Sequence, residues 1–462
     1  MKTFSKKEKR TILFLIGMMA AVILAGLIFN ILLSKNAEIF NAGLNFDNGD
    51  QKIVWSRYEK TEIELNESVE IKKSGVYHLS GNLENGMVTV DAGDARSKVK
   101  LILDNVSINN ESGPAIYIKS ADDIVIESAE GSENSLSSGE VFESYLKDEN
   151  VDGTIYSKGD LSFLGSGKIL VESKYQDAIV SKDDLVIRSG EIEINSADDG
   201  IRGKDSVYVA GGKLKINAKQ DGIKSTNDED GAKGFVCIED GEVEISAGDD
   251  GIHATTQLII AGGNVNIAKS YEGIEGSKIV INGGEIKIVA TDDGINVAGG
   301  KDESAFMRPG AEKFVKEEFL VLINNGELSI NASGDGIDSN GKIYINGGRL
   351  IIDGPISNND MVLDSNEGIF INGGEVFAVG SGGLAEKPNK NSFSLYSDFY
   401  FEKAQPKQTK IEIKDENGEV IFQHTAVKAM KYLFVSSEMF ENEHIYYIYT
   451  NGEIVSELNF SE

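Results

Sequence analysis

A short acidic turn recurs along this chain at nearly constant spacing, and it constrains the fold more than any other feature. Each copy is an acidic residue, then glycine or once alanine, then isoleucine, and successive copies lie 22, 22, 29, 22, 21 and 42 residues apart. The acidic anchors are Asp177, Asp199, Asp221, Asp250, Glu272, Asp293 and Asp335. A second turn, usually Gly-Gly, recurs with first six spacings of 22, 29, 22, 21, 42 and 22, so both series carry insertions at the same places. A period near 22 with apolar strands and glycine turns predicts a solenoid.

Short alternating segments separate the turns, as at residues 191–194 and 213–216. Alternation with a period of two places the Ile and Val residues on one face and the charged residues on the other. A second apolar stretch precedes each Gly pair, as at residues 258–260, and the isoleucine of the acidic turn is the third apolar element. Three short strands and three turns predict one coil of a parallel β-helix, with a continuous core through the stacked coils. The consensus of a leucine-rich repeat is missing.

The N-terminus carries the one segment that predicts a membrane helix. Residues 11–33 are an uncharged run of 23 residues, preceded by four lysines and Arg10. This length can cross a bilayer, and the preceding positive charges place residues 1–10 in the cytoplasm. A cleaved signal peptide is the alternative, but the apolar run is long for one and no clear cleavage site follows. We therefore expect a single-pass protein of the cell membrane with its C-terminal part outside the cell, or a secreted protein if the anchor is cleaved.

The rest of the chain divides by pattern. A polar stalk is predicted at residues 34–60, the parallel β-helix at 61–385 and a small C-terminal β domain at 386–462, where the strands become longer. Insertions are predicted to leave the coils at residues 131–152, 226–233 and 301–318.

Charge and cysteine content exclude several partners and one kind of cross-link. Without its first ten residues the chain has 40 Lys and Arg against 74 Asp and Glu. Such an acidic protein is not expected to bind nucleic acid, because that binding depends on neutralising phosphates. The single cysteine, Cys237, cannot form an intrachain disulfide. We therefore expect the solenoid to be stabilised by packing and by cations.

The acidic turns predict a metal site. Coils of a β-helix stack at about 4.8 Å, so anchors in register form a column of carboxylates. At that spacing each neighbouring pair repels by about 0.9 kcal/mol even in water, which favours a compensating cation. Calcium bonds oxygens at about 2.3–2.6 Å and suits carboxylates on adjacent coils, whereas one Cys and four His argue against zinc or copper. The predicted calcium ligands are Asp198, Asp199, Asp221, Asp249, Asp250, Glu272, Asp292 and Asp293.

An alternative explanation of the column needs no metal. Asp caps its own backbone and Gly supplies a positive φ, so stacked Asp-Gly turns form without an ion. The second acid at Asp198, Asp249 and Asp292 is unnecessary for the turn, and it favours the metal hypothesis.

Three bases stand in successive coils, three residues after an acidic anchor. They are Arg202, Lys224 and His253, and Tyr271 precedes another anchor. Calcium beside a row of bases is the arrangement needed to hold a carboxylated sugar polymer, and a tyrosine could stack on a sugar ring. We therefore predict these four residues as ligand-binding. The alternative is that Arg202 and Lys224 only pair with the aspartates.

Several of these motifs resemble one bacterial family. The segments 185–204, 269–275, 291–296 and 75–81 look like those of surface proteins of the calcium-binding β-helix carbohydrate-binding domain family. The resemblance implies a right-handed parallel β-helix that binds calcium and plant-cell-wall polysaccharide, namely acidic pectin-type chains and cellulose. The fold it implies is also similar to that of pectate lyases. The insertion at residues 301–318 departs from the family's pattern.

Three functions remain open on the sequence. The first is a membrane-anchored, calcium-dependent carbohydrate-binding protein without catalytic residues. The second is a calcium-dependent polysaccharide lyase, which needs a base; Lys224, Arg202 and Lys278 are candidates, but their spacing singles out none. The third is a structural adhesin or spacer, since a fold shared with lyases does not by itself confer activity.

Overall fold

The computed structural model describes residues 49–93, 96–297, 319–458 and 460 of this 462-residue chain. The chain divides into two compact units, Met1–Asn45 and Phe46–Glu462, and the first lies outside the described residues. The predicted membrane helix at 11–33 therefore lies outside them as well. Within the described ranges, no helix has both the length and the apolar character needed to cross a membrane.

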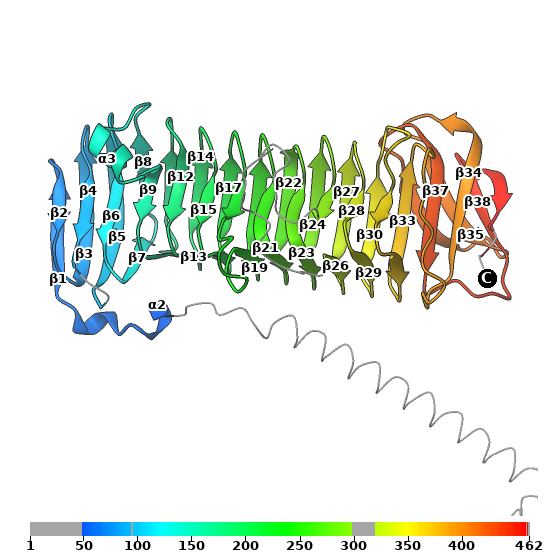
Figure 1. Ribbon diagram of the computed structural model, residues 1–462, viewed down its shortest axis with the longest axis horizontal. Coiled ribbons are helices and arrows are strands. Elements are labelled where there is room, and N and C mark those ends of the chain that lie inside the picture. Colours follow the sequence, from blue (N-terminus) through cyan, green and yellow to red (C-terminus); the bar gives the residue numbers. More distant parts are fainter. Residues whose placement is uncertain (1–48, 94–95, 298–318, 459, 461–462) are drawn as a thin grey trace, which may run out of the picture. The chain divides into compact units, whose positions relative to one another are not determined.

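The described chain is almost entirely β-structure, arranged as three parallel ladders, here called A, B and C (Figure 1). Each coil contributes one short segment to each ladder in turn, and the same segment of the next coil pairs with it in parallel. This arrangement is consistent with the predicted β-helix; its right-handed sense stays a prediction. The short helical elements at its start are α2 (Gly49–Lys52) and η1 (Trp55–Arg57).

Ladder A carries the acidic turns. Its strands are β2 (Val69–Ile71), β4 (Val88–Asp91), β6 (Ile116–Ser120), β9 (Gly153–Ser157), β12 (Asp177–Ser181), β15 (Ile201–Gly203), β18 (Ile223–Ser225), the first part of β21 (Ile252–Ile260), the first part of β23 (Ile274–Ile281), β25 (Ile295–Val297), β28 (Ile337–Ser339) and β31 (Leu363–Ser365).

Ladder B follows in each coil. Its strands are β1 (Lys60–Leu65), β3 (Gly75–Leu83), β5 (Lys98–Asn110), β7 (Asp123–Ser128), β10 (Asp160–Gly165), β13 (Asp184–Ile187), β16 (Ser206–Val209), β19 (Phe235–Ile238), the later parts of β21 and β23, β26 (Leu320–Ile323), β29 (Lys342–Ile345) and β32 (Ile369–Ile371).

Ladder C completes the coil. Its strands are the ends of β3 and β5, then β8 (Glu133–Ser138), β11 (Lys168–Glu172), β14 (Glu191–Asn195), β17 (Lys213–Asn217), β20 (Glu242–Ser246), β22 (Asn264–Ser270), β24 (Glu285–Ala290), β27 (Glu327–Ala332), β30 (Arg349–Asp353) and β33 (Glu375–Gly380).

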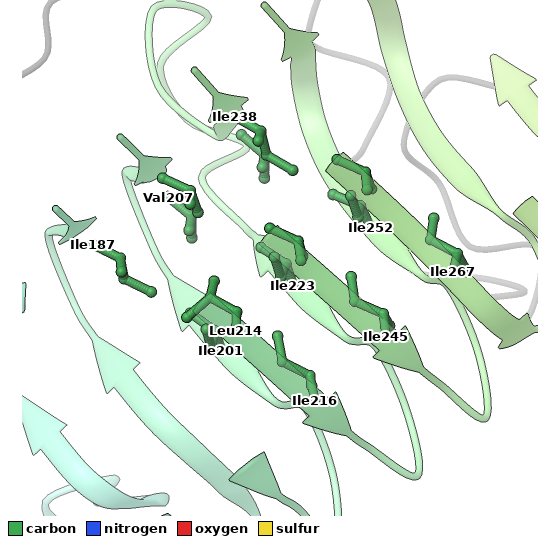
Figure 2. Packing of buried hydrophobic residues seen from close by; sticks show 14 of the residues in the cluster. Ile187, Ile201, Val207, Leu214, Ile216, Ile223, Ile238, Ile245, Ile252 and Ile267 are labelled. Atoms are coloured by element: carbon green, nitrogen blue, oxygen red, sulfur yellow. The ribbon is translucent and has the colours of Figure 1, made fainter. Parts of the chain in front are cut away.

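The apolar residues of all three ladders point into one core. Ile201, Ile223 and Ile252 are fully buried, and the inward residues of neighbouring coils stack on one another (Figure 2). Burying such a side chain contributes about 1.5–3 kcal/mol, so identical residues in register add up along the solenoid. The glycine in the second position of each second turn has a positive φ, such as 90° at Gly212 and 115° at Gly241. Glycine adopts that conformation without strain, which explains the second recurrent turn.

The first predicted insertion was too long. Glu133–Ser138 forms β8 and pairs with β5 and β11 in ladder C, so only residues 139–152 leave the coil, and they contain α3 (Ser144–Asp148). The reason is that β8 lacks the expected alternation, because its inward positions include Asn134 and Ser138, whose buried polar groups are hydrogen-bonded. Residues 226–233 lie between β18 and β19 without forming a strand, and the third predicted insertion lies outside the described residues.

The C-terminal strands change direction. β37 (Met430–Ser437) pairs antiparallel with β33, and β34 (Tyr396–Gln405) pairs antiparallel with β37. A separate antiparallel sheet has the order β36 (Val420–Thr425), β35 (Lys410–Asp415), β38 (Tyr446–Thr450) and β39 (Glu453–Glu457). Tyr432 and Phe434 of β37 belong to the same buried cluster as the solenoid core, so these strands close its C-terminal end.

Candidate functional site

Strand register brings the acidic anchors into one column. Ile179 pairs with Ile201, Ile201 with Ile223 and Ile223 with Ile252, so the anchor two residues before each isoleucine stacks on the next one. The turn glycines reinforce the stack, because the amide of Gly200 donates to the carbonyl of Asp221 at 2.8 Å, and the later turns repeat this bond. The sequence therefore places the column correctly.

Several carboxylates in the column accept a hydrogen bond from the backbone amide of the next anchor. Oδ1 of Asp177 accepts the amide N–H of Asp199 at 3.2 Å, and Asp199 and Asp221 do the same for Asp221 and Asp250 at 3.1 and 2.9 Å. Asp293 accepts the amide of Asp335 at 2.6 Å. The anchors therefore have a structural task that needs no metal, which is the alternative left open above.

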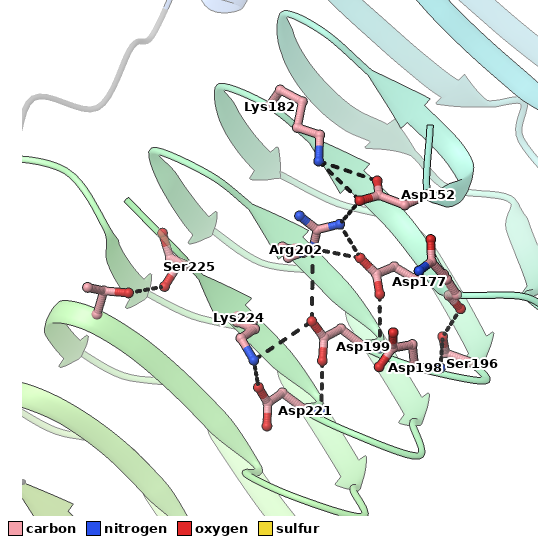
Figure 3. A network of polar contacts seen from close by, with 12 residues as sticks. Asp152, Asp177, Lys182, Ser196, Asp198, Asp199, Arg202, Asp221, Lys224 and Ser225 are labelled. Carbon is pink, nitrogen blue, oxygen red and sulfur yellow. Dashed lines mark hydrogen bonds and ion pairs between the residues drawn. The ribbon is translucent and has the colours of Figure 1, made fainter. Parts of the chain in front are cut away.

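Arg202 and Lys224 neutralise the first part of the column (Figure 3). Arg202 donates from Nε to Asp177 Oδ2 at 2.6 Å and from Nη2 to Asp152 Oδ2 at 2.7 Å. Lys224 Nζ contacts Asp221 Oδ2 and lies 4.0 Å from Asp199 Oδ2. Burial opposes the positive charge of both bases, but the aspartates outweigh it and raise the pKa of each above its ordinary value.

His253 occupies the same position one coil further on. Its Nδ1 lies 2.9 Å from Asp250 Oδ2 and 2.8 Å from Glu275 Oε2, and only 7 % of its side chain is exposed. Burial disfavours the imidazolium, but hydrogen bonds to Asp250 and Glu275 raise the pKa of His253 to about 10. Burial, followed by the neighbouring acids Asp221 and Glu275, still raises the pKa of Asp250 to about 9, so His253 compensates these two acids only in part.

The next coils carry acids without such bases. Carboxylate oxygens of Asp293, Asp335 and Asp338 lie within 4.8 Å of one another. In the described ranges no ion pair joins these residues or Glu272 to a Lys, Arg or His. Burial and then the neighbouring carboxylates raise the pKa of Asp293 to about 8 and that of Asp335 to about 7. Burial, followed by Glu275, raises the pKa of Glu272 to about 7.

Asn296 adds a neutral oxygen to this group. It pairs with Glu275 on one side and Asp338 on the other, and only 8 % of the residue is exposed. Its Nδ2 donates to Glu272 Oε2 at 2.8 Å, while its Oδ1 is buried without a hydrogen-bond partner. Leaving a buried acceptor without a partner costs about 1–3 kcal/mol, and a cation bound to this oxygen would recover that free energy.

Gly334 lets the carboxylates of Asp292 and Asp293 approach the backbone. A Cβ at this glycine would collide with the carboxylate oxygens of Asp292 and Asp293. Carboxylate and amide oxygens around a small cradle are the ligands that Ca²⁺ prefers, and no sulfur or imidazole is part of the group. The residues Glu272, Asp292, Asp293, Asn296, Asp335 and Asp338 are here called the uncompensated group. They offer oxygens of the kind that calcium binds, and those of Asp293, Asp335 and Asp338 lie close enough together to share one ion.

Comparison with known proteins identifies the family. A family model described as carbohydrate-binding domain-containing protein matches residues 65–305, just over half of the chain. The chain belongs to this family. A curated protein of Acetivibrio thermocellus with the same description is 35 % identical over 157 residues, which are 34 % of this chain and 54 % of that protein. The chain thus matches about half of the length of this relative.

A solved structure is also similar. It is titled "Structure of the polysaccharide lyase-like protein from C. thermocellum, Gadolinium derivative", with 30 % identity, a TM-score of 0.41, and coverage of 52 % of this chain and 97 % of that one. A TM-score of 0.41 is too low to establish a shared overall fold. The family match covers Arg202, Lys224, His253 and Asn296 but ends before Asp335.

The structure separates the residues predicted as ligands into two sets. The first, Asp199, Asp221 and Asp250, is paired with bases, and Asp198 and Asp249 lie one residue before two of these anchors. The second set, Glu272, Asp292 and Asp293, belongs to the uncompensated group.

Asn296, Asp335 and Asp338 were not among the ligands predicted from the sequence, although Asp335 was recognised as an anchor of the column. For Asn296 and Asp338 the available signal was the position three residues after each anchor, which changes from Arg202, Lys224 and His253 to acids and an amide. Tyr271 is 48 % exposed, and a hydrogen bond to Asp292 is the main cause that raises its pKa to about 12.

Proposed function

We propose that this protein is a calcium-dependent polysaccharide-binding protein of the cell surface. The family supports polysaccharide binding, and calcium dependence is supported by the uncompensated group. The observation that carries the proposal is the buried Oδ1 of Asn296, which has no hydrogen-bond partner and is flanked in register by Glu275 and Asp338.

The uncompensated group would hold the ion through oxygen alone. Asp293, Asp335 and Asp338 supply carboxylates whose oxygens are already close together, and Asn296 supplies the amide oxygen. A bound calcium ion would supply positive charge to these acids and a bridge to carboxylates of a uronate polymer. Asp292 and Asp293 reach the backbone at Gly334, so a side chain there would close the cradle.

The sugar chain would lie beside Tyr271, which is exposed and borders Asp292. We assign Arg202, Lys224 and His253 to compensation of the column, because each is already held by carboxylates. A formal charge of −30 repels a polyanion at long range, so an acidic chain such as polygalacturonate needs the bridging cation. Neutral cellulose would not share this requirement.

The alternatives predict different behaviour. A lyase needs an unprotonated base, and the raised pKa values of Arg202 and Lys224 make them poor candidates. A structural spacer would bind no sugar. For location, we retain the predicted anchor at residues 11–33, with the remaining chain outside the cell.

Incubation with polygalacturonate tests the proposal. The full-length protein, in a detergent without a sugar headgroup, should co-sediment with the polymer in calcium and not in EDTA, without unsaturated product. Asp335→Asn with Asp338→Asn should abolish retention, whereas Glu244→Gln, an exposed charge change in ladder C, should leave it intact. Unsaturated product would establish the lyase instead, and absence of both binding and product would leave the spacer.

A further inference from the structure

A groove lined mainly by polar residues lies on the turns between ladders C and A, away from the uncompensated group. It has a volume of about 560 Å³ and is lined by three successive coils together with Glu140 of the insertion at residues 139–152. Register explains its form, because Glu172, Asn195 and Asn217 pair in one row at the ends of β11, β14 and β17.

Small residues make the groove. The next position in each coil is Ser173, Ser196 and Ala218, and all three line it. The position after that is Lys174 in one coil and Lys219 two coils later, with only Ala197 between them. At about 4.8 Å per coil, the two lysines are therefore separated by roughly 10 Å, with the small side chain of Ala197 between them.

The side chains of the groove suit hydroxyl groups. Asn217 Nδ2 donates to Asn195 Oδ1 at 3.2 Å, which aligns the two amides, and each amide retains further hydrogen-bonding capacity. Two lysines and two glutamates border the groove, so their formal charges cancel. This local neutrality contrasts with the strongly acidic column, whose members Asp198 and Asp199 directly follow Ala197.

We propose that this groove binds a neutral, hydroxyl-rich segment of a sugar chain, without calcium. The inference rests on the proposed function and adds a second sugar site to it. Amides, ammonium groups and carboxylates together can donate to and accept from sugar hydroxyls, and no ion is needed to bridge them. An acidic chain gains nothing here, since Glu140 and Glu172 offset Lys174 and Lys219.

Affinity electrophoresis separates this site from the calcium site. The full-length protein is run, in a detergent without a sugar headgroup, through gels containing hydroxyethylcellulose or polygalacturonate, each with calcium or with EDTA. The neutral polymer should retard the protein equally in both buffers. Asn195→Ala with Asn217→Ala should weaken that retardation at least about tenfold, since it removes both aligned amides. Asn264→Ala, an exposed amide in the same ladder outside the groove, is the matched control.

Each other result overturns the inference. No retardation by the neutral polymer, loss of that retardation in EDTA, or equal retardation of the double variant would each show that the groove is not a neutral sugar site. Calcium-dependent retardation by polygalacturonate reports the proposed function separately, so either can fail alone. An unchanged circular dichroism spectrum and melting curve of the double variant establishes that it is folded.

Discussion

The residue at position 296 should decide whether this protein needs calcium. Lys224 stands in the same row of ladder A as Asn296, three coils earlier. It contacts Asp221, the anchor of its own coil, and lies 4.0 Å from Asp199, the anchor of the preceding coil. A lysine at position 296 would stand in the same relation to Asp293 and Glu272. Asn296→Lys should therefore replace the ion with a fixed charge.

The magnitude follows from the geometry. One charge pair at 4 Å is worth about 4 kcal/mol at an effective dielectric of 20, and two pairs are available. Burying the ammonium costs several kcal/mol, so we expect a net gain of about 1–2 kcal/mol in the metal-free protein. In contrast, calcium at one hundred times its dissociation constant should stabilise the natural protein by about 2.7 kcal/mol and the variant by almost nothing.

Thermal unfolding in calcium and in EDTA measures both effects. The natural protein should melt lower in EDTA, whereas Asn296→Lys should melt at nearly the same temperature in both buffers. Asn264→Lys makes the same charge change on the exposed face of ladder C and should keep the full response. An Asn296→Lys variant that responds to EDTA as strongly as the natural protein would refute the reasoning.

Three further predictions concern charge and location. In EDTA the protein should lose stability as pH rises from about 4 to about 8, because folding raises the pKa of Asp293 to about 8 and that of Asp335 to about 7, and the folded state therefore binds more protons in this range. Calcium should flatten this pH dependence. A melting temperature in EDTA that does not change with pH would contradict the prediction. Arg202→Met should destabilise the protein by about 3 kcal/mol in urea unfolding, because Asp177 is left buried without its partner, and adding Asp177→Asn should recover much of that loss; a cost below about 1 kcal/mol would show that the pair is not needed. The native protein should sediment with membranes and keep residues 1–10, whereas a soluble form that starts near Ala37 would rule out the anchor.

Much of the solenoid could be predicted because every coil needs the same inward apolar residues and the same turns, so the pattern recurs along the sequence. The isoleucines after the anchors had to stack if the coils were in register, and Ile201, Ile223 and Ile252 do so at full burial. The failure at residues 133–138 has a specific cause. The inward side chains of this strand include Asn134 and Ser138, whose polar groups are satisfied by hydrogen bonds, and an apolar pattern cannot reveal such a strand.

The groove was not predicted, because its lining is made of common residues. Ser173, Ser196 and Ala218 carry no motif, and their effect depends on being small beside longer neighbours in adjacent coils. Such a shape follows from three-dimensional register and from Glu140, which comes from an insertion whose start the sequence misplaced.

The site itself shows why an acidic repeat alone cannot identify a calcium protein. The carboxylate of Asp177 caps the amide of Asp199 whether or not an ion is present, so the turn favours an acid at every coil. Repulsion along the column must then be relieved coil by coil. Arg202 does so where it reaches Asp177, and no described base does so where Asn296 stands beside Glu272. The need for a cation is therefore set three residues after the anchor, and a reader of the sequence should examine that position first.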